Sequence, residues 1–241
     1  MDNENQQLRT QELAQATSLV QQRISAACIQ SGRQQESVKL IWVSKMHPLS
    51  DVEAAIAAGA TAFGENKVQE ALEKFANSRP GIELHIIGPV QSNKWRKAAH
   101  VAQWIHSADS IAALQKYEEV CAEQSKHLQV LIQVNTSGEA SKSGLDMANA
   151  KSFLEHLPNL PHLTYRGLMT IGIHTGVAED SRAGFAWLRK LRDEFLARGG
   201  IYANFTELSM GMTDDLEVAI TEGSTLVRVG TAIFGARHYP A

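Results

Sequence analysis

Residues 38–45, with the sequence VKLIWVSK, give the first indication of the fold. Ile41, Trp42 and Val43 form an apolar run without polar alternation, as in a strand that is covered on both faces. The stretch VLIQV (130–134) has the same character. Parallel strands that lie between helices have this pattern, so the sequence predicts an α/β protein with a parallel sheet.

Strand-like and helix-like segments alternate along the rest of the chain. Strands are expected at 38–45, 61–66, 83–88, 104–109, 129–135, 163–172, 205–211 and 226–235. Ser50, Ser110 and Asp214 follow three of them and are expected to cap the next helix. Eight alternations in this length predict a (β/α)8 barrel, and a doubly wound open sheet is the alternative.

An extra helix is expected before the first strand, over residues 6–30. Its apolar stripe has helical spacing, and Gly32 would end it. The stripe consists of Leu13, Ala16, Val20, Ile24 and Cys28. No linker or break in composition divides the chain, so we expect one domain over residues 1–241, with residues 1–32 packed on the barrel.

Composition argues against several classes of partner. The 241 residues are 44% hydrophobic and 20% charged, and the net charge of −3 gives no reason to expect nucleic acid or an anionic membrane as a partner. The polar start of the chain has no signal-peptide core. Cys28 and Cys121 are isolated, which predicts reduced thiols in a cytoplasmic protein. The nine histidines have no metal-binding spacing, so no metal is expected.

Lys45 stands where the first expected strand ends. Active groups of such barrels lie at the carboxyl ends of the strands, and Lys45 shares a strand face with Ile41 and Val43. If that face is the barrel interior, the amine lies at the rim over an apolar floor. Burial disfavours the charged form of an amine, and a neutral amine is what Schiff-base formation requires. The alternative is a lysine that reaches solvent from a strand end.

Two turns near the C-terminus predict an anion site. SMGMTDD (209–215) and VGTAIFG (229–235) each pass from a strand through small residues into a helix. Backbone N–H groups after Ser209 and around Gly230 and Thr231 would then point to one region, where barrels often bind phosphate. Alternatively, Gly211 and Gly230 serve only their tight turns.

Arg228 is an unusual residue for a strand, because it lies between two valines and on the same face as Gly230. A buried guanidinium requires a partner, either a ligand atom or a carboxylate such as Glu207. Asn66 could bind the edge of a ligand. Asn93 and Lys94 are expected to cap a helix or lie on the surface. The loop 135–145 is expected to be mobile over the barrel mouth, with Lys142 as a solvated charge.

Six stretches together resemble the YggS/PROSC family, the pyridoxal phosphate (PLP) homeostasis proteins. They are VSK (43–45), FGENKVQE (63–70), HIIGPVQSNK (85–94), GLMTI (167–171), LSMGMTDDLEVAI (208–220) and STLVRVGTAIFG (224–235). Met46, His47, Ile86 and Thr213 depart from what is usual in the family. The resemblance implies one barrel similar to the N-terminal domain of alanine racemases.

The resemblance also implies a set of cofactor-binding residues and no catalytic ones. Lys45 would hold PLP as an internal aldimine, Asn66 would lie beside it, and Arg228 would face the pyridine nitrogen. The phosphate would lie at the two turns. The implied residues there are Ser209, Met210, Gly211, Gly230 and Thr231. An arginine cannot accept a proton from the ring nitrogen, so PLP would stabilise carbanions weakly.

Three functions follow from these residues. The first is a monomeric PLP carrier or regulator without robust turnover, which could supply PLP-dependent apo-enzymes. The second is a PLP-dependent amino-acid racemase, although the chain ends at Ala241 without room for the further domain of racemases, and its four tyrosines carry no matching motif. The third is a class I aldolase without PLP, although such barrels usually carry the lysine on a later strand.

Overall fold

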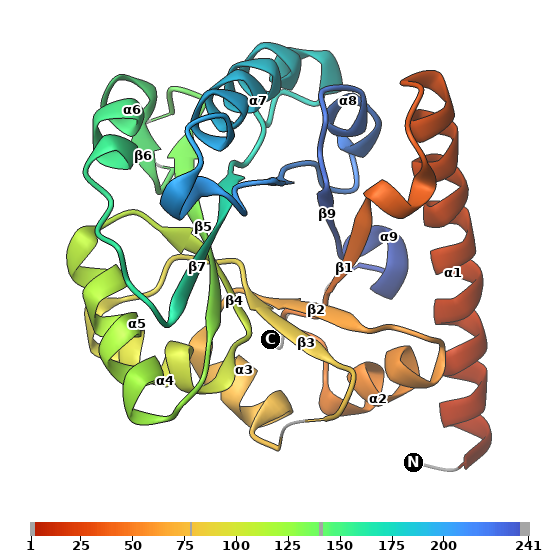
Figure 1. Cartoon of the computed structure of the whole chain (residues 1–241). Coiled ribbons are helices and arrows are strands. Elements are labelled where there is room, and N and C mark those ends of the chain that lie inside the picture. Colours follow the sequence, from red (N-terminus) through yellow and green to blue (C-terminus); the bar gives the residue numbers. More distant parts are fainter. Residues whose placement is uncertain (1–2, 78, 140–141, 237–241) are drawn as a thin grey trace.

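Eight parallel strands close into a barrel, as the alternating pattern predicts (Figure 1). The computed structural model describes residues 3–77, 79–139 and 142–236. The barrel strands are β1 (Lys39–Val43), β2 (Ala62–Glu65), β3 (Glu83–Ile86), β4 (Trp104–Ala108), β5 (Leu128–Asn135), β7 (Leu163–Met169), β8 (Glu207–Ser209) and β9 (Leu226–Val229). Pairing of β4 with β5 closes the ring, so the open-sheet alternative is wrong.

The strands are apolar on both faces because each face meets a different core. Inside the barrel, Ile41 packs in one cluster with residues of other strands, whereas its neighbour Trp42 belongs to the cluster beneath the helices. The inner cluster contains Ile41, Ala62, Trp104, Leu131, Met169 and Leu226. The missing alternation in the sequence therefore results from a strand layer that is enclosed by side chains on both sides.

The barrel strands are surrounded by helices (Figure 1). The helices are α1 (Asn3–Gln30), α2 (Leu49–Ala57), α3 (Val68–Phe75), α4 (Trp95–Val101), α5 (Ile111–Glu123), α6 (Met147–Glu155), α7 (Arg182–Leu196), α8 (Leu216–Thr221) and α9 (Thr231–Phe234). None of the helices within the described ranges combines the length and the apolar character that crossing a membrane requires.

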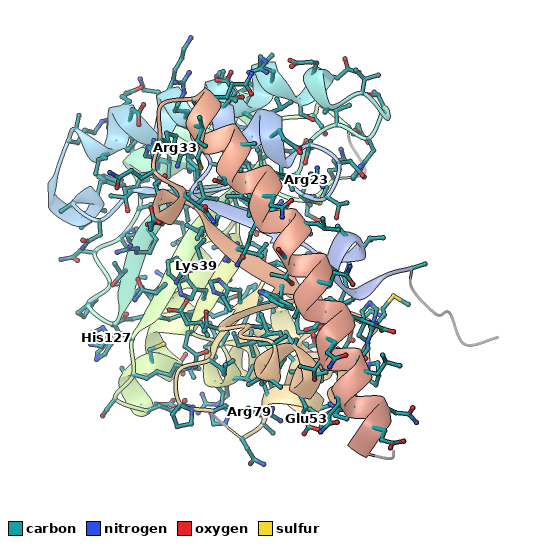
Figure 2. All side chains as sticks on the ribbon, turned by 90° about the vertical axis from the view of Figure 1, so that its right-hand side faces the viewer. Arg23, Arg33, Lys39, Glu53, Arg79 and His127 are labelled. Carbon is teal, nitrogen blue, oxygen red and sulfur yellow. The ribbon has the colours of Figure 1, made fainter. Side chains whose placement is uncertain are left out.

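The extra helix α1 lies outside the ring and packs against α2, α8 and α9 (Figures 1 and 2). It begins three residues earlier than predicted, and it is followed by Gly32 with φ of 67°. The expected stripe is buried except Ala16, which is half-buried. Arg33 donates to the carbonyl of Ile220 in α8 at 2.8 Å, which links the segment after α1 to the ring of helices.

Some local predictions differ from the structure, mainly at the ends of elements. The last strand ends at Val229 instead of residue 235, because the chain turns at Gly230 into the short helix α9. A two-residue strand, β6 (Leu145–Asp146), was not predicted and pairs with β5. Ser110 caps α5 as predicted, but Ser50 and Asp214 cap no helix, since Pro48 precedes α2 and Asp215 precedes α8.

Candidate functional site at the barrel mouth

A cavity of about 550 Å³ opens at the carboxyl ends of the strands. Five predicted site residues line it, from segments that are far apart in the sequence: Lys45, Asn66, Arg228, Gly230 and Thr231. Other lining residues come from the segments after β3, β5, β7 and β8. The barrel thus brings an amine, an amide, a guanidinium and a hydroxyl to one space, as expected for a site at this end of the strands.

Lys45 follows β1 and is half-buried at the cavity wall. Its strand neighbour Val43 lines the same cavity, and Ile41 lies in the inner core, so the lysine is on the interior face as predicted. The next residue, Met46, has φ of 64°, in the left-handed region that a non-glycine residue rarely adopts. The backbone that carries Lys45 is therefore held in an uncommon turn.

Side chains behind Lys45 hold both of its backbone neighbours. The amine of Lys74 in α3 donates to the carbonyl of Ser44 at 2.7 Å and to Glu70 at 2.6 Å. Glu70 in turn accepts the N–H of Met46. Lys74 also donates at 3.0 Å to Glu65, which is fully buried, and burial raises the pKa of that carboxyl. The turn around Lys45 is thus fixed by a buried ionic network.

Arg228 in β9 is 4% exposed and donates to neutral groups. It contacts Ser209 Oγ at 2.6 Å and the carbonyl of Thr170 at 2.9 Å. The predicted alternative partner, Glu207, is wrong, because Glu207 pairs with Arg166 at 3.1 Å. Within the described ranges, no carboxylate oxygen lies within 4.0 Å of the Arg228 guanidinium.

Burial lowers the pKa of Arg228 to about 10, and the charge of Asp215 opposes this change. The guanidinium is therefore still a cation at neutral pH. A buried cation without an adjacent carboxylate favours a ligand that offers an electron-rich or negatively charged atom.

Three predicted site residues lie behind the cavity wall. Ser209 is fully buried, and Met210 packs in the core beneath the helices, with its N–H bonded to the carbonyl of Leu226 at 3.2 Å. Gly211 has φ of 92°, and a Cβ there would lie 2.6 Å from the Cβ of Ala219. The residues that follow them, 212–214, line the cavity instead. The direct role of Ser209, Met210 and Gly211 in ligand binding stays a prediction.

Lys142 is a correction to the expected site. Its side chain is 13% exposed, lines the cavity, and donates to Glu139 at 2.6 Å and to the carbonyl of Gly172 at 2.8 Å. The expectation of a solvated charge is therefore wrong. Residues 140 and 141 of this loop lie outside the described residues. Lys94 and Asn93 do not line the cavity, in agreement with the expectation for them.

Gln133 and His47 are two of the lining residues that were not predicted as part of the site. Gln133 in β5 has its Oε1 buried without a hydrogen-bond partner, while its Nε2 donates to the carbonyl of Ser143 at 2.9 Å. His47 has its Nδ1 at 3.1 Å from Asp51, and its ring stacks on Phe234 at 4.9 Å. The sequence contained a signal for His47, which stands two residues after Lys45. To predict Gln133 as a lining residue, the register of the strands around the barrel would have had to be known.

Comparison with known proteins agrees with this geometry. The alanine racemase N-terminal domain family matches residues 24–238. Over 228 residues the chain is 44% identical to the pyridoxal phosphate homeostasis protein of Haemophilus influenzae, with 92% of this chain and 94% of that protein covered. The chain belongs to the PLP homeostasis protein family. The resemblance seen in the sequence is thereby confirmed.

Solved structures separate this family from the racemases. PipY of Synechococcus elongatus PCC7942, solved with PLP bound, has a TM-score of 0.79 and 34% identity, covering 92% of this chain and all of that one. Alanine racemase of Clostridium difficile has a TM-score of 0.66 at 14% identity, and only 55% of that chain is covered. The racemase likeness shows the fold alone: this chain shares a barrel with racemases.

The residues of the cavity fit the chemical groups of PLP. An amine suits an aldehyde, a buried guanidinium suits a ring nitrogen, and hydroxyl and backbone groups suit a phosphate. Two glycines allow the backbone segments around the cavity to approach each other closely. A Cβ at Gly88 would lie 2.5 Å from the carbonyl oxygen of Asn66, and a Cβ at Gly230 would lie 3.1 Å from the carbonyl oxygen of Val43. Across the described residues, no three His, Cys, Asp or Glu side chains form a metal-binding group.

Proposed function

We propose that this protein holds PLP in the barrel-mouth cavity as a Schiff base on Lys45 and acts as a carrier or regulator of the PLP pool. The observation that carries the proposal is that Lys45 and the buried cation Arg228 line one cavity from neighbouring strands. The relatives named PLP homeostasis protein and the PLP-bound PipY supply independent support.

The other cofactor contacts follow from the lining of the cavity. The phosphate would lie at the turns after β8 and β9, where Thr213, Gly230 and Thr231 face the cavity. Asn66 would lie at the edge of the ring. Ser209, Met210 and Gly211 would shape the first of these turns from behind.

Arg228 favours holding PLP over using it in catalysis. Its guanidinium has only donors, so it bonds an unprotonated ring nitrogen and cannot keep that nitrogen protonated. An unprotonated ring withdraws electrons weakly, which narrows the reactions that the bound cofactor can support. We therefore propose storage and delivery of PLP, by a monomer in the cytoplasm, to PLP-dependent apo-enzymes. The free, buried thiols of Cys28 and Cys121 are consistent with a reducing compartment.

The test compares Lys45→Ala with Lys94→Ala, a lysine outside the cavity lining. Purified protein is mixed with PLP, its visible absorbance is recorded, and borohydride then fixes the cofactor for peptide mass spectrometry. We expect unsubstituted protein and Lys94→Ala to show the Schiff-base band and an adduct on Lys45, and Lys45→Ala to show neither. A normal band in Lys45→Ala, or no PLP uptake by the unsubstituted protein, would contradict the proposal.

The racemase alternative is tested with the same proteins. We expect no interconversion of alanine enantiomers by PLP-loaded protein, as followed by chiral chromatography. Turnover that is lost in Lys45→Ala and kept in Lys94→Ala would support a racemase instead.

A further inference from the structure

A row of polar side chains in contact with one another crosses the apolar interior of the barrel and ends at Arg228. It begins at the amino end of the strands, where Glu83 of β3 pairs with Lys39 of β1 at 2.8 Å; Lys39 is labelled in Figure 2. His85 Nε2 lies 3.3 Å from Glu83, and His85 Nδ1 lies 2.9 Å from His106 Nε2. These contacts lead inward from a partly exposed ion pair.

The second half of the row reaches the cavity wall. His106 Nδ1 lies 2.9 Å from Ser209 Oγ, which accepts from Arg228 at 2.6 Å. His85, His106 and Ser209 are each 0% exposed. The row therefore connects β3, β4, β8 and β9, and its last member is the guanidinium that lines the cavity.

The surroundings of the row are apolar. The inner core cluster of the barrel encloses it, and Trp104 stacks on His85 at 5.2 Å between ring centroids. Apolar side chains could fill such an interior, whereas buried polar groups cost free energy unless every one is satisfied. Two imidazoles inside the barrel therefore require an explanation other than packing.

The Glu83 end of the row fixes the position of the proton on each neutral ring. A carboxylate oxygen of Glu83 lies 3.3 Å from His85 Nε2 and can only accept, so a neutral His85 carries its proton on Nε2. His85 Nδ1 then accepts from the Nε2–H of His106, and the Nδ1 of a neutral His106 accepts from the Ser209 hydroxyl. Ser209 Oγ still has lone pairs with which it accepts from Arg228, which can only donate.

Both histidines must be neutral for this arrangement. Burial lowers the pKa of His106 well below its usual range, helped by the charges of His85 and Arg228. Burial also lowers the pKa of His85, although Glu83 opposes the change. One tautomer of each ring therefore satisfies the hydrogen bonds from His85 Nδ1 to Arg228 and turns the Nε2–H of His85 toward Glu83, 3.3 Å away.

We propose that His106, supported by His85, is a positioning residue for PLP: it holds the Ser209 hydroxyl as an acceptor and so aims the Arg228 guanidinium at the ring of the bound cofactor. This inference rests on the proposed function. It also changes the role of Ser209, whose hydroxyl proton is committed to His106. The Ser209 side chain then serves Arg228 instead of the phosphate.

The test uses His106→Leu, His106→Asn and the exposed control His127→Leu, which is labelled in Figure 2. The amide of Asn can replace Nδ1 as the acceptor for Ser209, whereas Leu leaves the proton of that hydroxyl without an acceptor. We expect His106→Leu to lower PLP affinity about tenfold and to shift the visible absorbance maximum of the bound cofactor. His106→Asn should retain affinity within about threefold, and His127→Leu should match the unsubstituted protein.

Normal PLP affinity and an unshifted spectrum in a folded His106→Leu would overturn the inference. If that variant fails to fold, the inference is tested by nitrogen-15 NMR of the histidines in the unsubstituted, PLP-free protein. We expect both buried rings to be neutral Nε2–H tautomers between about pH 6 and 8, and the His106 Nδ1 resonance to move on addition of PLP. An imidazolium, an Nδ1–H tautomer or an unmoved resonance would refute it. Failure of the unsubstituted protein to bind PLP would instead refute the proposed function.

Discussion

Lys45 depends on residues that never enter the cavity. Lys74 holds the carbonyl before it, and Glu70 holds the N–H after it. Both side chains belong to α3, which follows the next strand, so the turn that presents the amine is built by a second βα unit. A site residue of this kind is positioned by the ionic network beneath it as much as by its own strand.

Lys74→Met should destabilise the protein strongly. It removes the amine that pairs with Glu65, a fully buried carboxylate whose Oε2 already has no hydrogen-bond partner. An uncompensated buried charge costs about 3–5 kcal/mol, so the free energy of unfolding in urea should fall by about 3 kcal/mol or more. The Schiff-base band should also form more slowly, because the turn at Met46 loses its support.

The matched control is Lys116→Met, which breaks an exposed pair with Glu119. We expect its free energy of unfolding to stay close to that of the unsubstituted protein, because exposed pairs contribute little. Adding Glu65→Gln to Lys74→Met should restore part of the lost stability. Equal effects of the two lysine variants would show that the network is not an important support.

Single site residues differ in how well the sequence predicts them. Lys45 and Arg228 were predictable because a charge on the inward face of an apolar strand is conspicuous. His106 was not, because its partner Ser209 stands 103 residues later and the two meet only through barrel closure. Its signal was an inward histidine in WIHS (104–107), which has no meaning until the facing strands are known.

At the scale of elements, α1 is tied to the rim of the cavity by one arginine. Arg9 donates to both carboxylate oxygens of Asp51 in α2, at 2.9 and 3.0 Å, and to the carbonyl of Phe234 in α9 at 2.9 Å. Asp51 also bonds His47, which lines the cavity. Burial alone would raise the pKa of Asp51, but the hydrogen bonds from His47 and Arg9 lower it to about 2.

Arg9→Met should therefore weaken PLP binding from outside the barrel. Without the arginine, α9 and the ring of His47 lose an anchor, and α9 begins at Thr231, beside the expected phosphate. We expect PLP affinity to fall about three- to tenfold in a fluorescence titration, because one charge-assisted contact is lost at the rim. Arg9→Lys should be intermediate, since an ammonium cannot form the bidentate pair.

Arg33→Met provides the comparison. Arg33 joins the segment after α1 to α8 through the Ile220 carbonyl, and neither residue lines the cavity. The Arg33→Met substitution should lower the melting temperature of the protein without changing its affinity for PLP. If Arg33→Met weakened PLP binding as much as Arg9→Met, general loosening of α1 would be the cause.

Elements were predicted well in kind and less well at their ends. The spacing and number of apolar residues identify a strand. The segment VRVGTAIFG is mostly apolar from the strand into α9, so the sequence did not show where β9 ends. The cap at α8 was placed one residue early, because two aspartates stand together and only the fold selects Asp215, whose side chain accepts the N–H of Met212 at 2.7 Å.

At the scale of the whole molecule, closure of the barrel explains what the sequence shows only in part. Eight alternations predicted the architecture, but the contact of β4 with β5 depends on register, which shifts between Ile105 and Ala108. Closure also creates the interior in which the rings of His85 and His106 meet edge to face. The pH dependence of global stability should report on that interior.

Acid should destabilise the protein well above the range in which carboxylates titrate. The folded barrel keeps His85 and His106 neutral, whereas in the unfolded chain each has a pKa of about 6.5. Below about pH 6.5 the unfolded chain therefore binds more protons, and the free energy of unfolding must fall as the pH falls. The slope for each histidine approaches about 1.4 kcal/mol per pH unit.

Carboxyl groups also change the free energy of unfolding with pH, and different carboxyl groups change it in opposite directions. Hydrogen bonds from His85 and Lys39 lower the pKa of Glu83 to about 2, so its contribution is lost only as the pH falls from about 4 toward 2. Burial raises the pKa of Glu65, Asp109 and Asp215, which favours the folded state as they take up protons. Comparison of proteins with and without the two histidines therefore isolates their part of the change between about pH 7.5 and 5.5.

The experiment compares urea unfolding at about pH 7.5 and 5.5 for three proteins: the unsubstituted chain, His85→Gln with His106→Asn, and the exposed control His127→Gln. The double variant should be less stable at the higher pH but should lose less stability on acidification, since its amides cannot take up protons in either state. The control should lose as much as the unsubstituted chain. If the double variant lost the same amount too, the buried imidazoles would not be the groups that titrate on unfolding, and the row of neutral side chains through the barrel would be wrong.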